Sequence, residues 1–188
     1  MQTFLPYPDF DRSVRALDAK RLGKQRVETL QVIRALTWKD YGWANHPAVL
    51  MWKGFEEALG RYGFACCEAW VELGFGDTCA ATMTDDLRSA GIETVRAQTE
   101  LEAAGALPSW LGDEELHRSH QSALVRKDPE HYGPMFPGVP DDLPYVWPVR
   151  SEAVIERERR AIERQRQKRS RAAKKAWVTR RRNARNQA

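Results

Sequence analysis

Cysteine is scarce in this sequence, and its three copies are not spaced for a metal site or a disulfide framework. Cys66 and Cys67 are adjacent within an apolar run, and Cys79 stands alone. Zinc sites built from cysteine use spaced pairs such as Cys-x-x-Cys, and small disulfide-bonded domains carry more cysteines. We therefore expect buried free thiols in a reducing cytoplasm, and neither a metal nor a cofactor.

Long apolar runs are also missing, since no stretch approaches the roughly 20 residues that span a bilayer. Pro6 and Pro8 interrupt the N-terminus, and the apolar segment of a secretory signal does not follow them. The chain likewise lacks the alternating pattern of strands and the Gly-rich loop that cradles phosphates. These absences favour an all-α cytoplasmic protein that does not enter a membrane.

The stretch 12–39 has the period of a helix, which Asp11 or Ser13 is expected to cap and which ends near Thr37. Its apolar side carries Leu22, Leu30, Ile33 and Leu36, and its polar side carries Lys20, Arg21, Lys24, Glu28 and Gln31. Gly23 inside the helix predicts close approach of another backbone. The stretch holds eight Lys or Arg and two acids, so the Glu28 carboxylate should stay ionised. Either this is a solvated face with one pairing Glu, or a phosphate-binding surface with one catalytic carboxylate.

Further helices follow from the same period. Asn45-His46-Pro47 predicts a helix start, and an apolar stripe from Trp52 to Leu73 predicts a core-facing helix that stops at Gly74. Shorter helices are expected around 85–89 and within 93–104, and a clear one over 113–126. Six of the ten prolines lie between 129 and 148 with four aromatic residues among them, which predicts an ordered strap over a compact helical domain of residues 1–150.

The charge is divided unevenly along the chain. Residues 151–188 hold fourteen Lys or Arg and four Glu, a net +10, whereas the first 150 residues carry −6. We expect a second unit here, a helical or partly disordered basic tail that contacts the phosphate backbone of a nucleic acid. Such contacts give affinity that depends on salt and not on base sequence, and they indicate nothing about chemistry.

Two histidines and a serine on the predicted helix 113–126 evoke other chemistries. His117 and His120 are three residues apart and could share a metal, but a zinc site needs further ligands. Ser122 lies close by, yet the sequence around it is no nucleophile elbow. Both hypotheses are therefore weak.

Four motifs in order resemble one family. They are the segments 17–22 (LDAKRL), 26–30 (RVETL) and 45–47 (NHP), and His120 through Asp128-Pro129 to Tyr132. Their order and spacing resemble the pyrimidine dimer DNA glycosylases, small all-helical bacteriophage-type repair enzymes with uncharacterised bacterial relatives. The resemblance covers residues 1–147 and omits the basic tail.

The resemblance implies a mechanism in which an N-terminal amine attacks the sugar carbon that bears the target base. A Glu on the first long helix stabilises the developing sugar cation, and Glu28 matches its position. The family exposes a Thr amine after removal of Met, but Gln2 is too bulky for that removal, so the nucleophile here would be the amine of Met1. α-Amines are less basic than Lys, so an appreciable fraction is free at neutral pH. Water-mediated excision, or Lys24 as the imine former, are the alternatives.

The sequence departs from the family at two further points. Val27 stands where the family has an Arg directly before its Glu, and Arg26 is one step further away. The segment before Leu22 is also longer, so delivery of the amine to Glu28 is left open. The predicted DNA-contacting residues are Arg21, Lys24, Arg26, His46, His120, Arg126, Lys127 and Tyr132. The alternatives are ordinary surface cations, a packed tyrosine, and histidines that cap a helix or pack.

Together these patterns predict a monomeric DNA glycosylase, with or without a strand-cleaving lyase step at the abasic site. It would act on double-stranded DNA, extrude a damaged or modified pyrimidine, and use Met1 and Glu28 as its catalytic residues. The rival reading is a non-catalytic DNA- or RNA-binding protein on the same scaffold, gripping mainly through its tail.

Overall fold

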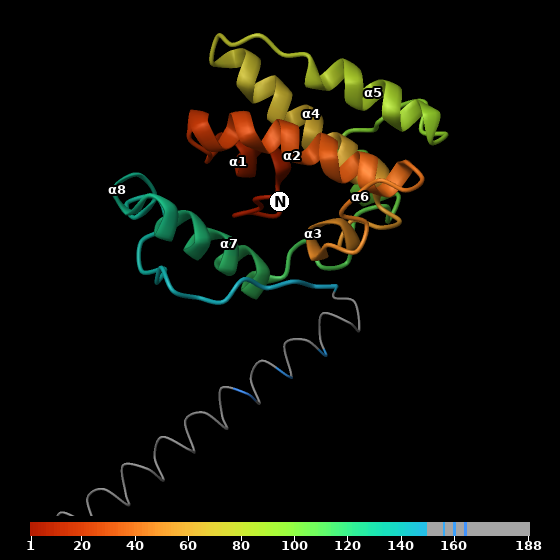
Figure 1. Cartoon of the computed structure of the whole chain (residues 1–188). Helices are drawn as coiled ribbons and strands as arrows, with labels where there is room; N and C mark the ends of the chain where they lie inside the picture. The colour runs from red at the N-terminus through yellow and green to blue at the C-terminus, as the bar shows by residue number, and fades with distance from the viewer. Residues whose placement is uncertain (150–155, 157–159, 161–163, 165–188) are drawn as a thin grey trace, which may run out of the picture. The chain divides into compact units, whose positions relative to one another are not determined.

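The computed structural model describes residues 1–149 together with residues 156, 160 and 164. In the body formed by residues 1–149 the chain makes eight helices and no strand, which confirms the predicted all-α class for this part (Figure 1). The predicted basic tail lies outside the described residues apart from those three positions. None of the described helices is long and apolar enough to cross a membrane.

The predicted first helix is in fact two helices, α1 (Phe10–Arg15) and α2 (Ala19–Thr37). Asp9 caps α1 and Asp18 caps α2, each by accepting a hydrogen bond from the backbone N–H three residues later. The predicted caps were therefore wrong. Ser13 is buried in α1, and its hydroxyl bonds the backbone of Tyr7 instead. Asp18 interrupts the helical period because its carboxylate satisfies the free N–H groups of a new helix start.

The second predicted helix is also divided, into α3 (Pro47–Leu50) and α4 (Glu56–Glu72). Gly54, with φ +85°, turns the chain between them. His46 caps α3 through its Nδ1, which accepts a hydrogen bond from Ala48 N at 3.1 Å. The predicted stop at Gly74 is confirmed by its φ of +88° directly after the C-cap of α4.

Four helices complete the body: α5 (Cys79–Ser89), α6 (Gln98–Ala103), α7 (Glu114–Lys127) and α8 (Pro129–Tyr132). Helices were expected in each of the first three regions. The fourth was missed, because residues 129–132 were assigned to the proline-rich strap. Residues 133–149 form no helix and are fixed to α7 by the hydroxyls of Ser119 and Ser122, which accept from Val146 N and Leu143 N.

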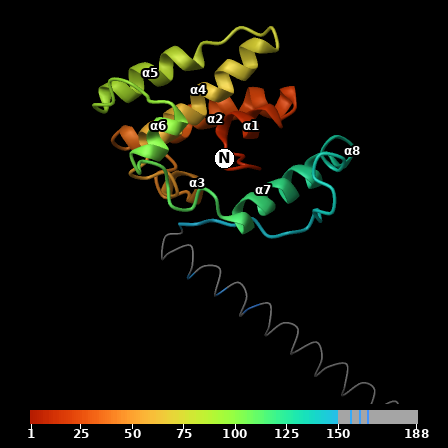
Figure 2. The same cartoon turned by 180° about the vertical axis from the view of Figure 1, so that it is seen from behind.

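Helix α2 packs against α4 and α5 on one side, and the N-terminal segment lies between α2 and α7 on the other (Figures 1 and 2). A Cβ at Gly23 would come within 2.9 Å of the Trp70 ring, so the close approach predicted there is made by an indole rather than a backbone. Cys66 and Cys67 are buried free thiols as predicted, and burial raises the pKa of both.

Candidate active site

The N-terminal segment crosses the middle of the body, and side chains rather than a neighbouring strand satisfy its backbone. From α2, Gln25 bonds it twice: its Oε1 accepts from Phe4 N at 3.0 Å, and its Nε2 donates to Gln2 O at 2.9 Å. Trp52 Nε1 donates to the hydroxyl of Thr3 at 3.0 Å. Since Gln25 is only 1% exposed, these bonds are made where water cannot replace them.

Helix α7 holds the same segment from the opposite side. His120 Nδ1 accepts from Leu5 N at 2.9 Å. His117 Nε2 accepts from Gly112 N, so its Nδ1 carries the proton and donates to Leu5 O at 2.8 Å. Burial lowers the pKa of His120 to about 3, and the neighbouring His117 adds to the effect. His120 is 0% exposed, so the predicted contact of this residue with DNA was wrong.

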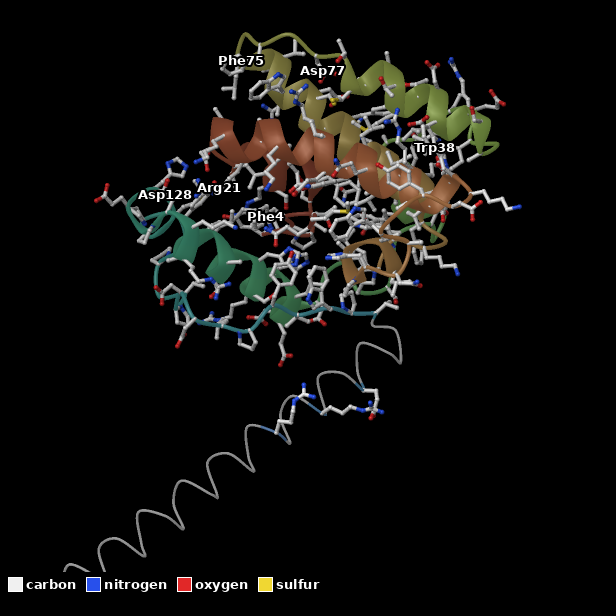
Figure 3. All side chains as sticks on the ribbon, viewed as in Figure 1. Phe4, Arg21, Trp38, Phe75, Asp77 and Asp128 are labelled. Atoms are coloured by element: carbon white, nitrogen blue, oxygen red, sulfur yellow. The ribbon has the colours of Figure 1, made fainter. Side chains whose placement is uncertain are left out.

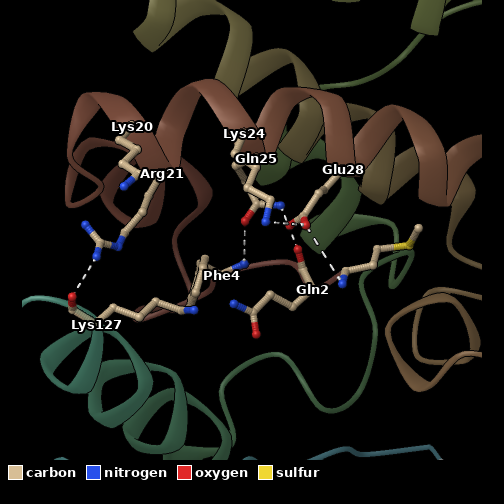
Figure 4. A pocket seen from close by; sticks show the side chains of 9 residues that line it. Gln2, Phe4, Lys20, Arg21, Lys24, Gln25, Glu28 and Lys127 are labelled. Carbon is tan, nitrogen blue, oxygen red and sulfur yellow. Dashed lines mark hydrogen bonds and ion pairs between the residues drawn. The ribbon is translucent and has the colours of Figure 1, made fainter.

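The hydrogen bonds from α2 and from α7 together place the start of the chain beside Glu28. The α-amine of Met1 lies 3.8 Å from Glu28 Oε1, and the two side chains are 4% and 13% exposed. Lys24, one turn earlier on α2, places its Nζ 3.5 Å from the same oxygen, although its side chain is 73% exposed. The longer N-terminal segment therefore brings the amine to the carboxylate, a point that the sequence left open (Figure 4).

A cavity of about 440 Å³ opens at this pair. Its lining comes from the N-terminal segment, α2 and the end of α7: Met1, Gln2, Phe4, Lys20, Arg21, Lys24, Gln25, Glu28 and Lys127. Four of these side chains are cations and one is a carboxylate. A cavity with that positive charge attracts phosphate. Its single carboxylate, Glu28, lies beside the α-amine of Met1.

Arg21 and Lys127, two of the predicted DNA-contacting residues, line the cavity, and Arg21 is held in place by a network with α8. Its guanidinium donates to Asp18 Oδ2 at 2.5 Å and to Lys127 O at 2.9 Å, and Asp128 lies 3.6 Å away (Figure 3). Burial opposes ionisation of Asp18, but hydrogen bonds from Tyr132 and Arg21 outweigh it and lower the pKa of Asp18 to about 2.

Tyr132 belongs to this network and not to a DNA-contacting surface. Its hydroxyl donates to Asp18 Oδ2 at 2.5 Å and accepts from Asp18 N at 3.0 Å, and the residue is 0% exposed. The predicted DNA contact was wrong because the ring of Tyr132, at the end of α8, is buried against the start of α2.

Three other predicted residues lie outside the cavity lining. Arg26 forms an ion pair with Asp77, and its guanidinium lies over the Trp70 ring at 4.4 Å. Figure 3 shows Asp77 on the α4–α5 side of α2 and Phe4 on the other side, so Arg26 is turned away from the cavity. Its predicted phosphate contact was therefore wrong. Arg126 is exposed near the end of α7 but does not line the cavity.

His46 is close enough to the amine and the carboxylate to be affected by both. Burial and the positive amine of Met1 lower the pKa of His46, while Glu28 opposes that change. Of the two predicted roles, helix capping is the one that its hydrogen bond to Ala48 N supports. The ring borders the site without lining the cavity.

The sequence did not reveal the roles of Gln25, Gln2 and Phe4. Gln25 carries no charge and was assigned to neither the apolar nor the polar side of the helix. Neither periodicity nor charge therefore identified it as a residue of the site. Gln2 and Phe4 line the cavity only because the extended segment crosses the body, which no local pattern indicates. In the part of the chain that the structure describes, no three His, Cys, Asp or Glu side chains are grouped as metal ligands.

Residues 1–83 match the family model described as pyrimidine dimer DNA glycosylase. This part of the chain is similar to that family. The match supports the suspected resemblance over the three motifs that lie before residue 84, and it leaves the fourth, at residues 120–132, untested. It includes Met1, Gln25 and Glu28 but ends before α7. Searches of curated proteins and of solved structures gave no match.

Proposed function

We propose that the protein is a DNA glycosylase that excises a damaged or modified pyrimidine, with the α-amine of Met1 as nucleophile and Glu28 as the catalytic carboxylate. The observation that supports this most is their 3.8 Å separation inside a cationic cavity. The Glu28 side chain is only 13% exposed, so its charge has lost hydration and is stabilised by the positive amine beside it. The family match over the same residues supports the same chemistry.

The first steps follow from the two groups. Water takes a proton from the ammonium, and the free amine attacks C1′ of the deoxyribose. The bond from C1′ to the base breaks, and the base leaves with the bonding electrons and takes up a proton. Positive charge develops on the sugar as this bond stretches, and the ionised Glu28 stabilises it.

The sugar then opens to an imine between C1′ and the α-nitrogen. An imine acidifies the hydrogen on C2′, so a base can remove it while the 3′ phosphate departs, which cuts the strand. Glu28 is the nearest carboxylate for that step. The alternative remains excision by water, in which no imine forms and the strand stays whole.

The cations of the cavity are proposed to hold the DNA backbone. Lys20, Arg21 and Lys127 would contact phosphates on either side of the reacting nucleotide. Lys24 has a second possible use, since its Nζ is 3.5 Å from Glu28 and can replace Met1 as the imine former. Arg126 is proposed as a more distant phosphate contact.

Borohydride trapping tests the mechanism. The protein is incubated with ultraviolet-irradiated duplex and, separately, with duplex containing an abasic site. Reduction should give a covalent adduct that peptide mapping assigns to Met1. Acetylating the α-amine should abolish the adduct, whereas the control Lys24→Gln should keep it. An adduct mapped to Lys24 in the native protein would refute the role of Met1, and DNA binding without any adduct would favour water-mediated excision or a non-catalytic binder.

Glu28→Gln tests the carboxylate, because it keeps the shape and removes the charge. Excision should fall by roughly 100-fold or more, the usual effect of losing one electrostatic stabiliser. Affinity for the damaged duplex should stay within about threefold. An equal fall in affinity and excision would show that Glu28 serves only to hold α2 and the N-terminal segment together.

A further inference from the structure

The loop between α2 and α3 (residues 38–46) presents a tryptophan in an unusual backbone conformation. Trp43 has φ +76°, a region that bulky non-glycine residues rarely adopt, and its side chain is 61% exposed. Its carbonyl accepts a hydrogen bond from His46 N at 2.8 Å, so the turn that starts α3 fixes this conformation. Strained residues that the surroundings hold in place gather at functional sites.

Trp43 contacts a histidine that lies near the proposed catalytic pair. Its ring meets His46 in a T-shaped contact with centroids 5.6 Å apart, and His46 is the histidine on which both the Met1 amine and Glu28 act. Figure 4 shows Glu28 on one side of the cavity and Arg21 and Lys127 on the opposite side. Trp43 is thus linked to the carboxylate through its contact with His46.

The neighbouring Trp38 is exposed as well but is engaged by its own loop. The Arg34 guanidinium lies 4.6 Å from its ring centroid, and Tyr41 meets it at 5.8 Å. Trp43 has a single aromatic neighbour among the residues described, and that contact is edgewise. With 61% of the residue exposed, much of the indole surface is accessible for stacking.

We propose that Trp43 inserts its indole into the DNA stack at the reacting nucleotide and fills the space that the extruded base leaves. This inference rests on the proposed function. Extruding a base costs stacking, and a flat aromatic ring regains much of it whatever the neighbouring sequence. Apolar side chains that enter a base step in this way also hold the duplex open.

The test is a pair of binding constants that need no catalysis. One duplex is intact, and the other carries a tetrahydrofuran abasic analogue, whose sugar cannot form an imine. The native protein should prefer the analogue, and Trp43→Ala should lower that preference by about tenfold. Trp43→Phe should keep most of it. Trp38→Ala, the matched control on the same loop, should leave it unchanged.

Trp43→Gly separates stacking from folding, because it removes the ring and relieves the positive φ at once. It should bind like Trp43→Ala while melting no lower than the native protein. An unchanged preference in Trp43→Ala, or no preference in the native protein, would overturn the inference. Failure of the borohydride adduct would overturn the proposed chemistry alone, since the binding comparison does not depend on it.

Discussion

Gln25 joins the proposed nucleophile to the helix that carries the proposed carboxylate. Its amide bonds both Gln2 O and Phe4 N, so the backbone next to Met1 is fixed relative to Glu28 three residues further along α2. A nucleophile on a chain terminus needs such a support, because termini are otherwise mobile and misplacement by an ångström is costly in rate.

Gln25→Leu should therefore lower the yield of borohydride adduct at Met1 by tenfold or more while leaving DNA affinity nearly unchanged. Gln98→Leu is the matched control. Gln98 bonds Phe10 N and Pro8 O in the same manner but far from the amine, so its loss should reduce the melting temperature without moving the adduct yield. If the two variants lower the adduct yield equally, Gln25 has only a structural role.

His120 makes stability depend on pH. Its pKa is about 3 in the folded protein and about 6.5 in the unfolded chain, so its contribution is complete above 6.5 and is lost as the pH falls toward 3. Between pH 6.5 and 5, the free energy of unfolding should drop by about 1.4 kcal/mol per pH unit from this residue. Urea titrations measure it.

His120→Asn should flatten that dependence, because its amide oxygen can still accept from Leu5 N but does not titrate. His117 shares the direction of the pKa change through its own burial and accounts for part of the slope that remains. A slope insensitive to His120→Asn would show that burial does not lower the pKa of His120 below its unfolded value.

At the scale of elements, α8 secures the start of α2 through one hydroxyl. Tyr132→Phe removes both of its bonds to Asp18 and should destabilise the protein by about 1–2 kcal/mol. The pKa of Asp18 is about 2 in the folded protein, below its unfolded value, so the contribution of Asp18 is present above pH 4 and lost below it. The difference between native and variant protein should accordingly shrink from pH 5 to pH 2.

The existence of the longer helices could be predicted from periodicity, but the short α8 and the breaks at Asp18 and at residues 51–55 could not. Each break depends on which competing hydrogen bond is satisfied, and that is decided by packing. Glu28 and Lys24 could be chosen as candidates from the sequence. Glu28 is the one carboxylate on the cationic face of its helix, and Lys24 lies one turn earlier on the same face. Tyr132 and His120 were misassigned because a polar group that is buried by a distant element has the same local pattern as an exposed one.

At the scale of the molecule, the family match covers fewer residues than the proposed active site needs. The match ends at residue 83, but His117 and His120 of α7 hold the segment that carries the amine. A fragment of residues 1–83 should therefore show no cooperative unfolding and no adduct. It would also expose the core faces that Leu101, Leu116 and Leu124 cover.

Removal of residues 151–188 should have the opposite outcome. The deleted segment carries a net +10, so the slope of log affinity against log salt concentration should flatten and affinity should weaken. The adduct at Met1 should still form, since every residue of the cavity lies before position 128. A salt slope equal to that of the full chain would refute the predicted role of the tail.

The position of the Met1 amine beside Glu28 has a practical meaning for anyone who prepares this protein. One added residue, an affinity tag or a retained formyl group at that end would turn the amine into an amide, which is not nucleophilic, and would push a bulky group against Glu28. Protein with an N-terminal tag should bind damaged DNA without excising the base, whereas protein with a C-terminal tag should excise it.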